Sequence, residues 1–273
     1  AEGPTTLTGV LRARDTELML AALAALGARW EELGADPARL RVRPAPRVVV
    51  VSIGDELVEP GQSREAGDVF DANGHALACA VTDAGGQAFR VAAVPDELRA
   101  LADTIEDQLV RADVLITTGG LSVGQGDTVK EVLAPLGSVR FDAVAMSPGR
   151  QLGVGTVEGT PIFCLPGDPV SAQIAFETFV RPVLRQIAGR TSLHRSSLAA
   201  TISEGWHSPS GKREFVPVHV SGSPSRGYRA EPTTPPGTVR LHGLSEANAI
   251  AVVPEDTSTV VAGDTLHCLL LDA

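Results

Sequence analysis

Over most of the chain, apolar residues alternate between strand-like runs and helix-like stripes. Residues 48–53 form a largely β-branched run that is apolar except for Ser52, which is typical of a strand buried on both faces of a parallel sheet. Such alternation predicts a doubly wound α/β domain over residues 47–190. Further strands are predicted at 88–94, 114–118, 138–145, 152–157 and 161–165. Helices are predicted near 74–84, at 97–111 with Asp96 as a cap, from about Asp127, and from Pro169 to about Ile187.

The pattern changes after residue 189, where Pro and Gly become frequent. The remaining apolar runs there are short and strand-like, at 215–220, 249–253 and 266–271. Residues 191–273 are therefore predicted to form a small all-β domain.

The first 46 residues contain one clear periodic element, an amphipathic helix predicted from Asp15 to the stop at Gly34. The stretch 36–46, with three prolines, is interpreted as a linker, because proline cannot continue a helix or a central strand. The chain begins with Ala1 and not Met, so we expect residues 1–46 to be a remnant of domains further upstream. The apolar positions of the helix are Leu23, Leu26, Trp30 and Leu33.

Composition and charge exclude several classes of partner. The formal charge of −10 argues against a basic surface for nucleic acid or anionic lipid. No run reaches the roughly 18 apolar residues of a membrane span, so no membrane insertion is expected. Three well-separated cysteines give neither a disulfide framework nor a Cys-based zinc site, which favours a reducing, cytoplasmic location.

Four loops follow predicted strands, and in an open α/β sheet ligands bind beyond the carboxyl ends of the strands. Taken singly, each loop has an ordinary explanation as a turn or a helix cap, and no GxxxxGK or GxGxxG pattern is present. Their combination in one domain favours a binding site for an anionic ligand. The loops are residues 52–57, 117–127, 146–150 and 165–172.

These loops and their surroundings resemble the molybdopterin molybdenumtransferases, the family of MoeA and the gephyrin E-domain, over about residues 47–272. The match consists of many ordered stretches, which makes it specific for the family. The stretches are VVVVSIGDELVEPGQ (48–62), DAN (71–73), VPDELRAL (94–101), ADVLITTGGLSVGQGD (112–127), VKEVL (129–133), MSPGR (146–150), PIFCLPGDPVSAQIAFETFVRP (161–182), ANAIAVVPED (247–256) and VVAGDTL (260–266).

The resemblance implies a molybdopterin-binding α/β domain followed by a small β-barrel. It implies that adenylylated molybdopterin and molybdate are the substrates, that the metal is inserted into the dithiolene, and that AMP is released with the help of Mg²⁺. Glu56, Asp96 and Asp127 fall on the family's catalytic carboxylates, with Glu56 and Asp127 as Mg²⁺ ligands. The implied pterin-binding positions are Gly119, Gly120, Ser122, Gly124, Pro148, Gly149, Arg150, Pro166, Gly167, Asp168 and Ser171.

The chain departs from the family pattern at several points. Ala143 and Ser147 stand where lysines are typical, and neither side chain can supply their charge. Arg140 and Arg150 flank this gap and are candidate substitutes. Asp168 stands in place of a typical Asn, and two further domains precede the matching region in the family. We therefore expect a homodimer, or a partner chain that supplies the missing N-terminal domains.

Three alternatives to a working transferase remain open at this point. A degenerate family member would bind molybdopterin or act as a scaffold without turnover. A protein-interaction module would use the same fold without binding pterin. An adenylyltransferase would share the 117–127 loop, although the β domain and the 165–172 loop favour the insertion family. Among the other side chains, Cys79 and Cys164 are predicted to be buried packing residues.

Overall fold

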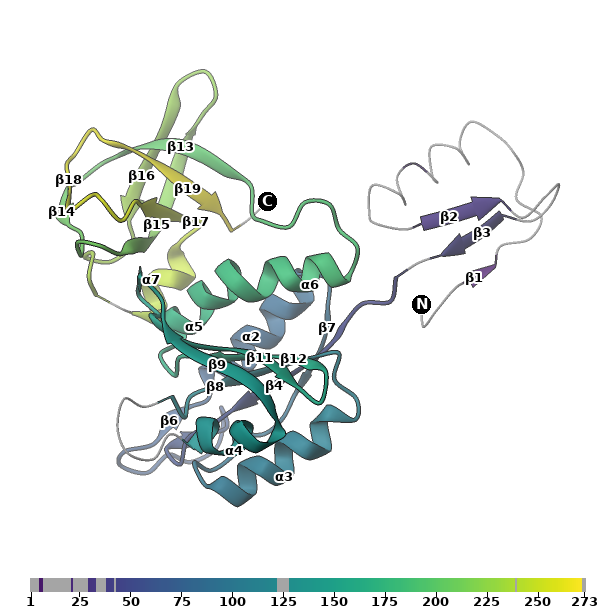
Figure 1. Cartoon of the computed structure of the whole chain (residues 1–273). Coiled ribbons are helices and arrows are strands. Elements are labelled where there is room, and N and C mark those ends of the chain that lie inside the picture. Colours follow the sequence, from purple (N-terminus) through teal and green to yellow (C-terminus); the bar gives the residue numbers. More distant parts are fainter. Residues whose placement is uncertain are drawn as a thin grey trace.

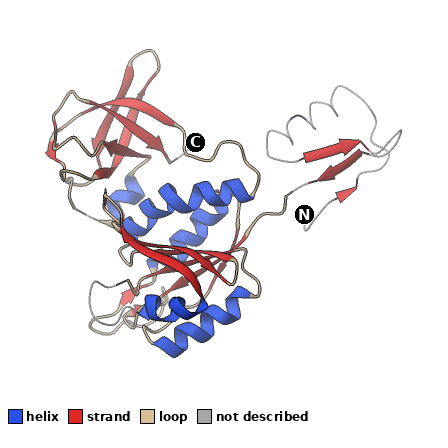
Figure 2. Ribbon diagram, viewed as in Figure 1, coloured by secondary structure: helices blue, strands red, loops and turns tan. Residues whose placement is uncertain are grey.

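The computed structural model describes residues 5–6, 21, 29–32, 38–41, 43–121, 128–238 and 240–271. The chain forms two large sheets. One is flanked by helices and the other closes into a barrel (Figures 1 and 2). Of the helices described, none is both long and apolar enough to cross a membrane.

The first sheet has six strands in the order β7-β4-β8-β12-β11-β9. Its centre is parallel and strongly apolar, and Val48, Val49, Val50 and Val51 of β4 have no exposed surface. The strands β11 and β9 extend it in antiparallel fashion. The strands are β4 (Arg47–Ser52), β7 (Gln87–Arg90), β8 (Val114–Thr118), β9 (Gly137–Ala143), β11 (Gln151–Val157) and β12 (Thr160–Leu165).

Helices cover both faces of this sheet (Figure 2), and each face has its own hydrophobic core. On one face, Val48 and Val50 pack with α2 (Ala72–Asp83) and with the continuous helical stretch α5 (Pro169–Ala175), η1 (Phe176–Val180) and α6 (Arg181–Ile187). On the other face, Val49 and Val51 pack with α3 (Leu98–Leu109) and α4 (Thr128–Leu136). The predicted doubly wound α/β fold is confirmed.

The second sheet closes into a five-stranded barrel, because β15 pairs with both β16 and β17. Alternate residues such as Val218, Ala230 and Cys268 fill its interior. The predicted all-β character is confirmed, although the pattern missed two barrel strands and the short helix α7 (Leu241–Glu246). The barrel strands are β13 (Ser197–Ile202), β15 (Arg213–Ser223), β16 (Gly227–Pro232), β17 (Ala249–Val253) and β19 (Thr265–Leu270).

The barrel is joined directly to the helix-flanked sheet. The short strand β10 (Met146–Ser147) lies in the connection between β9 and β11 of the first sheet. It pairs in parallel with the start of β15. Phe215 and Ile250 of the barrel belong to the same hydrophobic core as α2 and α5. In the linker between the sheets, Arg195 donates hydrogen bonds to the Glu177 carboxylate on η1 and to the carbonyl of Leu271.

The N-terminal segment differs from the prediction. Arg29–Glu32 forms strand β2, which includes Trp30 of the predicted helix, and Ala38–Arg41 forms β3 within the predicted linker. These strands pair antiparallel, and β3 also pairs with β1 (Thr5–Thr6). Most of the predicted helix before Arg29 lies outside the described residues. A helical spacing of apolar residues does not exclude a strand, which is what Arg29–Glu32 forms.

The prediction for the segment before α3 was also wrong in two details. The strand β7 ends at Arg90, and beyond it only Val94 pairs, in an isolated bridge with Ile53. The N-cap of α3 is Glu97, whose side chain makes no capping hydrogen bond, so Asp96 is not the cap. The backbone amide of Asp96 instead donates a hydrogen bond to the carboxylate of Asp55. This bond joins the segment before α3 to the loop that follows β4. Two short strands, β5 (Leu57–Val58) and β6 (Val69–Phe70), pair beside this region.

Candidate functional site

Sequence-distant loops meet at the carboxyl edge of the parallel strands. The strands β4, β8 and β12 run parallel and end at Ser52, Thr118 and Leu165. The register of β11 places Gly153 opposite Cys164 and Gln151 opposite Ala143, so the 144–150 turn lies at this same edge. The predicted convergence of the four loops is therefore present in the fold for their described residues.

The glycine loop after β8 lies very close to two other loops. Gly119 has φ +90°, and a Cβ on it would lie 2.1 Å from the carbonyl oxygen of Ile53. On its other side, a Cβ on Gly167 would lie 3.4 Å from the Cα of Gly119. The amide of Gly119 donates to the carbonyl of Leu165, so it is not available to an anion. The amide of Gly120 has no acceptor among the described residues.

The 146–150 turn packs against the start of α5. It contains a cis peptide bond between Ser147 and Pro148, and Gly149 has φ +85°. A Cβ on Gly149 would lie 3.1 Å from the carbonyl oxygen of Ser171, so the two loops are in close contact. Arg150 is exposed, and its side chain has no hydrogen-bond or ion-pair partner within the described ranges.

The fourth loop leads directly into α5. The side chain of Asp168 accepts a hydrogen bond from the amide of Ser171 at 2.8 Å, and Pro169 occupies the first turn. Asp168 is exposed, and Pro166 is half-buried. The predicted N-cap role of Asp168 is confirmed, and its capping hydrogen bond uses one carboxylate oxygen.

Exposed carboxylates lie beside the ends of β4 and β7. A Cβ on Gly54 would lie 2.7 Å from Oε2 of Glu56, so the Glu56 side chain folds back over its own loop. Asp96 Oδ1 lies 3.8 Å from the position that a Cβ on Gly120 would occupy. The remaining predicted positions Ser122, Gly124 and Asp127 lie outside the described residues. Within the described ranges, no three His, Cys, Asp or Glu side chains are grouped closely enough to hold a metal ion.

Behind this edge, a half-buried ion pair lies beside the start of α2. Arg90 donates to both carboxylate oxygens of Glu59, at 2.6 and 2.9 Å, and lies 3.4 Å from Asp71. The hydrogen bond from Arg90 lowers the pKa of Glu59 below its usual value. Asp71 also accepts from the hydroxyl of Ser52 and from the amide of Gly74, which joins β4 to the first turn of α2.

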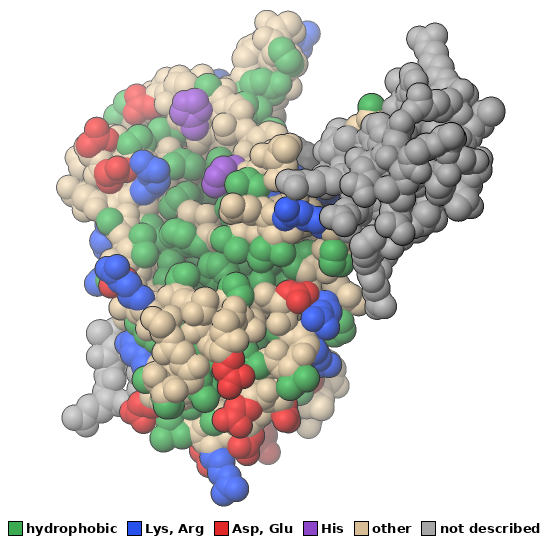
Figure 3. Space-filling view, turned by 45° about the vertical axis from the view of Figure 1, so that its right-hand side comes forward, with side chains coloured by type: hydrophobic (Ala, Val, Ile, Leu, Met, Phe, Trp, Pro, Cys, Tyr) green, Lys and Arg blue, Asp and Glu red, His purple; other side chains and the backbone are tan. Residues whose placement is uncertain are grey.

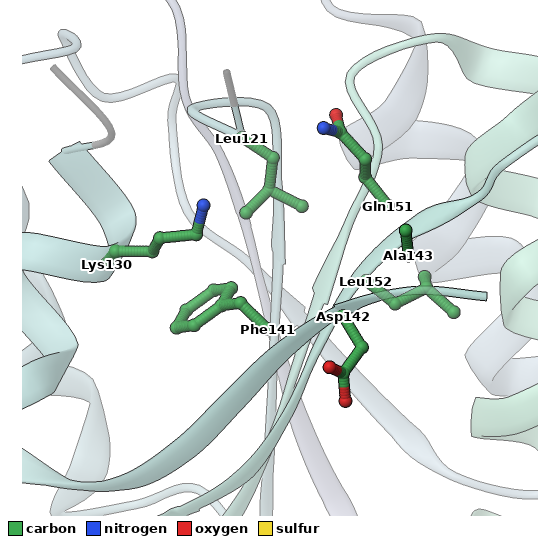
Figure 4. Close-up of a pocket in the computed structure, with 7 residues that line it drawn as sticks. All are labelled: Leu121, Lys130, Phe141, Asp142, Ala143, Gln151 and Leu152. Atoms are coloured by element: carbon green, nitrogen blue, oxygen red, sulfur yellow. The ribbon is translucent and has the colours of Figure 1, made fainter. Parts of the chain in front are cut away.

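A hollow of about 130 Å³ lies at the same edge and contains a lysine that the sequence prediction missed. The ammonium group of Lys130 on α4 lies 5.4 Å from the centre of the Phe141 ring. Ala143 and Gln151 line the opposite wall, and the Asp142 carboxylate points away from Lys130 (Figure 4). Asp142 pairs with Arg140 at an exposed position, and Arg140 does not line this hollow. The sequence motif VKEVL contains Lys130, but nothing in the motif indicates that Lys130 faces Ala143 and Gln151 across a hollow.

A second hollow lies away from the sheet edge that carries the four loops. It is at the waist of the molecule, where the helices α2 and α5 of the first sheet meet the barrel and α7. It measures about 450 Å³, and hydrophobic side chains gather at this waist in Figure 3. Cys79 of α2 lines it and is exposed, which contradicts the predicted burial, because its position on the helix faces away from the sheet. Cys164 is buried as predicted. Burial raises the pKa of the third thiol, Cys268, to about 11.

Both sheets match families of known proteins. Residues 49–186 match the family described as "Probable molybdopterin binding domain". Residues 199–271 match the family described as "MoeA C-terminal region (domain IV)". The solved structure of a molybdopterin biosynthesis MoeA protein from Pyrococcus horikoshii superimposes with a TM-score of 0.74 at 25% identity, covering 96% of this chain and 61% of the other.

Similar proteins carry related names. Molybdopterin molybdenumtransferase 2 of Mycobacterium tuberculosis is 38% identical over 240 residues, which cover 84% of this chain and 58% of the relative. Gephyrin of Dictyostelium discoideum is 28% identical over 91% of this chain and 38% of its own length. The chain thus spans little more than half the length of the molybdenumtransferase relative. It belongs to the molybdopterin molybdenumtransferase family, which includes MoeA and gephyrin.

Proposed function

We propose that this chain acts in molybdenum cofactor biosynthesis, where it binds adenylylated molybdopterin and inserts molybdate into the dithiolene, with release of AMP. The observation that carries the proposal is the convergence of the Gly119, Gly149 and Gly167 loops at one sheet edge. The family match supports the pterin as the ligand. Loops at this edge are where open α/β sheets bind ligands.

The proposed pterin site divides into anion-binding and shape-determining parts. The amide of Gly120, which has no acceptor among the described residues, and the exposed guanidinium of Arg150 can bind phosphate oxygens. The close packing of the loops around Gly119 leaves no room for added side chains and so determines the shape of the site. The other residues that we assign to the site are Ser122, Gly124, Pro148, Gly149, Pro166, Gly167, Asp168 and Ser171.

Glu56, Asp96 and Asp127 are proposed as the catalytic carboxylates. The exposed oxygens of Glu56 and Asp96 fit the hard oxygen ligands that Mg²⁺ prefers, and Mg²⁺ needs only one or two carboxylates when phosphate oxygens complete its shell. Glu56 and Asp127 would hold the ion. When bound, it supplies positive charge to the phosphate oxygens.

Molybdate, the second proposed substrate, is a dianion that needs a cationic neighbour. Lys130 supplies an ammonium group on the wall opposite Ala143, and the Gln151 amide can donate a hydrogen bond beside it. We propose that Lys130 takes over the charge that neither Ala143 nor Ser147 provides.

We further propose that residues 47–190 and 191–273 are the two functional units, and that a second copy or a partner chain completes the site. The chain covers 58% of its molybdenumtransferase relative, so much of the relative has no counterpart here. Purified chain is incubated with adenylylated molybdopterin, molybdate and Mg²⁺, with and without a chain that carries the missing domains. We expect AMP release that depends on molybdate.

A second candidate function is favoured by one specific observation. Ala143 and Ser147 are both present at the site edge, and neither carries a charge. A scaffold that binds molybdopterin without turnover would tolerate them. Pterin binding without molybdate-dependent AMP release, in the presence of the missing domains, would overturn the transferase proposal and support the scaffold.

A further inference from the structure

Asn73, in the first turn of α2, lies between the ends of β8 and β12. It is buried, with 8% of its surface exposed. Its Nδ2 group donates one hydrogen bond to Oγ1 of Thr118 and another to the carbonyl oxygen of Gly167, both at 2.8 Å. One side chain therefore bridges the loop after β8 and the loop after β12, which are far apart in the sequence.

The chemistry of its partners determines the orientation of this amide. The carbonyl of Gly167 can only accept a hydrogen bond, so the nitrogen of Asn73 must face it. Thr118 already uses its hydroxyl proton to donate to the carbonyl of Pro166 at 2.8 Å, so it must accept from Asn73. Both Nδ2 protons are thus committed, in a chain of hydrogen bonds that leads from α2 through β8 to the start of the fourth loop.

The same orientation leaves Oδ1 of Asn73 buried and without a partner among the described residues. A buried, unpaired acceptor lowers stability, and an apolar side chain of similar size would avoid that cost. Packing alone therefore does not explain an amide at this position. Its two donated hydrogen bonds are what an apolar side chain could not replace.

We infer that Asn73 is a positioning residue that sets the separation between the Gly119 and Gly167 loops and thereby preorganises the ligand site. This inference rests on the proposed function for the identity of the ligand but not for the effect on the loops. Asn73 makes no contact with ligand in this account. It acts through Thr118 and through the Gly167 carbonyl.

The test uses Asn73→Leu, which keeps the approximate size and removes both donors and the unpaired acceptor. Hydrogen–deuterium exchange of the free protein reports on the loops, and titration with molybdopterin reports on affinity. We expect amide exchange at residues 118–121 and 167–168 to become faster, and pterin affinity to fall about tenfold, as for the loss of one or two net hydrogen bonds. The temperature of unfolding should change little. Asn73→Ala gives the same test if the leucine variant does not fold.

The matched control is Leu77→Val on the same helix, because Leu77 is fully buried one turn further along and its apolar side chain donates no hydrogen bond to either loop. It should lower the temperature of unfolding and leave pterin affinity unchanged. Unchanged loop exchange in Asn73→Leu, or equal loss of affinity in both variants, would overturn the inference. If the unaltered chain binds no pterin, the proposed function fails, and the exchange experiment still decides the positioning role of Asn73.

Discussion

Gly119 lies so close to Ile53 that a Cβ on the glycine would be 2.1 Å from the isoleucine carbonyl oxygen. This contact joins the ends of β4 and β8, where Ile53 donates its own amide to the carbonyl of Thr118 at 2.9 Å. Two backbones can approach this closely only where no side chain separates them. The glycine is therefore required by the packing of neighbouring loops as well as by its positive φ.

Gly119→Ala should destabilise the protein and distort the loop. The positive φ alone costs about 1–3 kcal/mol for a residue with a Cβ, and the clash with Ile53 adds to it. Chemical denaturation measures the change in the free energy of unfolding. Gly61→Ala is the control, because Gly61 has φ +94° and no atom within 4 Å of the added Cβ. Equal losses in both variants would show that the contact with Ile53 contributes nothing.

Arg195→Ala should weaken the junction between the sheet and the barrel. Arg195 and Glu177 have only 10% and 8% of their side chains exposed, so the variant leaves a buried carboxylate with Arg181 as its remaining partner, at 3.7 Å. We expect a loss of about 3 kcal/mol in the free energy of unfolding. Arg213→Ala, which removes the exposed pair with Glu255, should cost less than about 1 kcal/mol. Similar losses in the two variants would contradict this difference.

The stability of the same junction should depend on acid pH. Partial burial raises the pKa of Asp83, but the hydrogen bonds and charges of Arg181 and Arg195 outweigh burial and lower it below 3.8. A carboxylate whose pKa is lower in the folded state stabilises the protein above its unfolded pKa and loses that contribution as the pH falls through its folded pKa. The stability difference between wild type and Asp83→Asn should therefore be constant above about pH 5 and shrink below pH 4. A constant difference down to pH 2.5 would contradict the assignment.

Lys130 and Ala143 allow a test of charge at the proposed molybdate site. Lys130→Ala should lower molybdate-dependent AMP release by about tenfold or more, because an uncompensated dianion loses a charge-assisted partner. Ala143→Lys in the Lys130→Ala background should restore part of the activity from the opposite wall. The control is Lys212→Ala, the other lysine of the chain. No loss in Lys130→Ala would show that another cation serves molybdate.

The sequence predicts the elements whose pattern follows directly from burial. Residues 48–53 and 114–118 are mostly apolar because both faces of a central strand are covered, and the structure places β4 and β8 there. The strand β16 was missed because it begins with Gly227, ends with Pro232 and has several exposed residues, so its apolar signal is weak. Trp30 fell within a helical spacing, yet the segment pairs as a strand.

The candidate site was only partly predictable for a related reason. The motifs locate loops along the chain, but contacts between loops depend on strand order and register. Asn73 stands in the quoted stretch DAN, and nothing in that stretch indicates that its amide reaches both Thr118 and Gly167. Lys130 is likewise separated in sequence from Ala143 and Gln151, and only the packing of α4 against β9 brings it to their hollow.

The most direct measurement of the central claim is the temperature of unfolding of the chain as molybdopterin is added. A ligand that binds only the folded state must raise this temperature, and the rise continues with the logarithm of the ligand concentration above Kd. We predict a progressive rise, reduced in Arg150→Ala and unchanged in Arg226→Ala, whose arginine is exposed on the barrel hairpin between β15 and β16. No rise at a molybdopterin concentration that saturates a full-length relative would contradict the proposed pterin site.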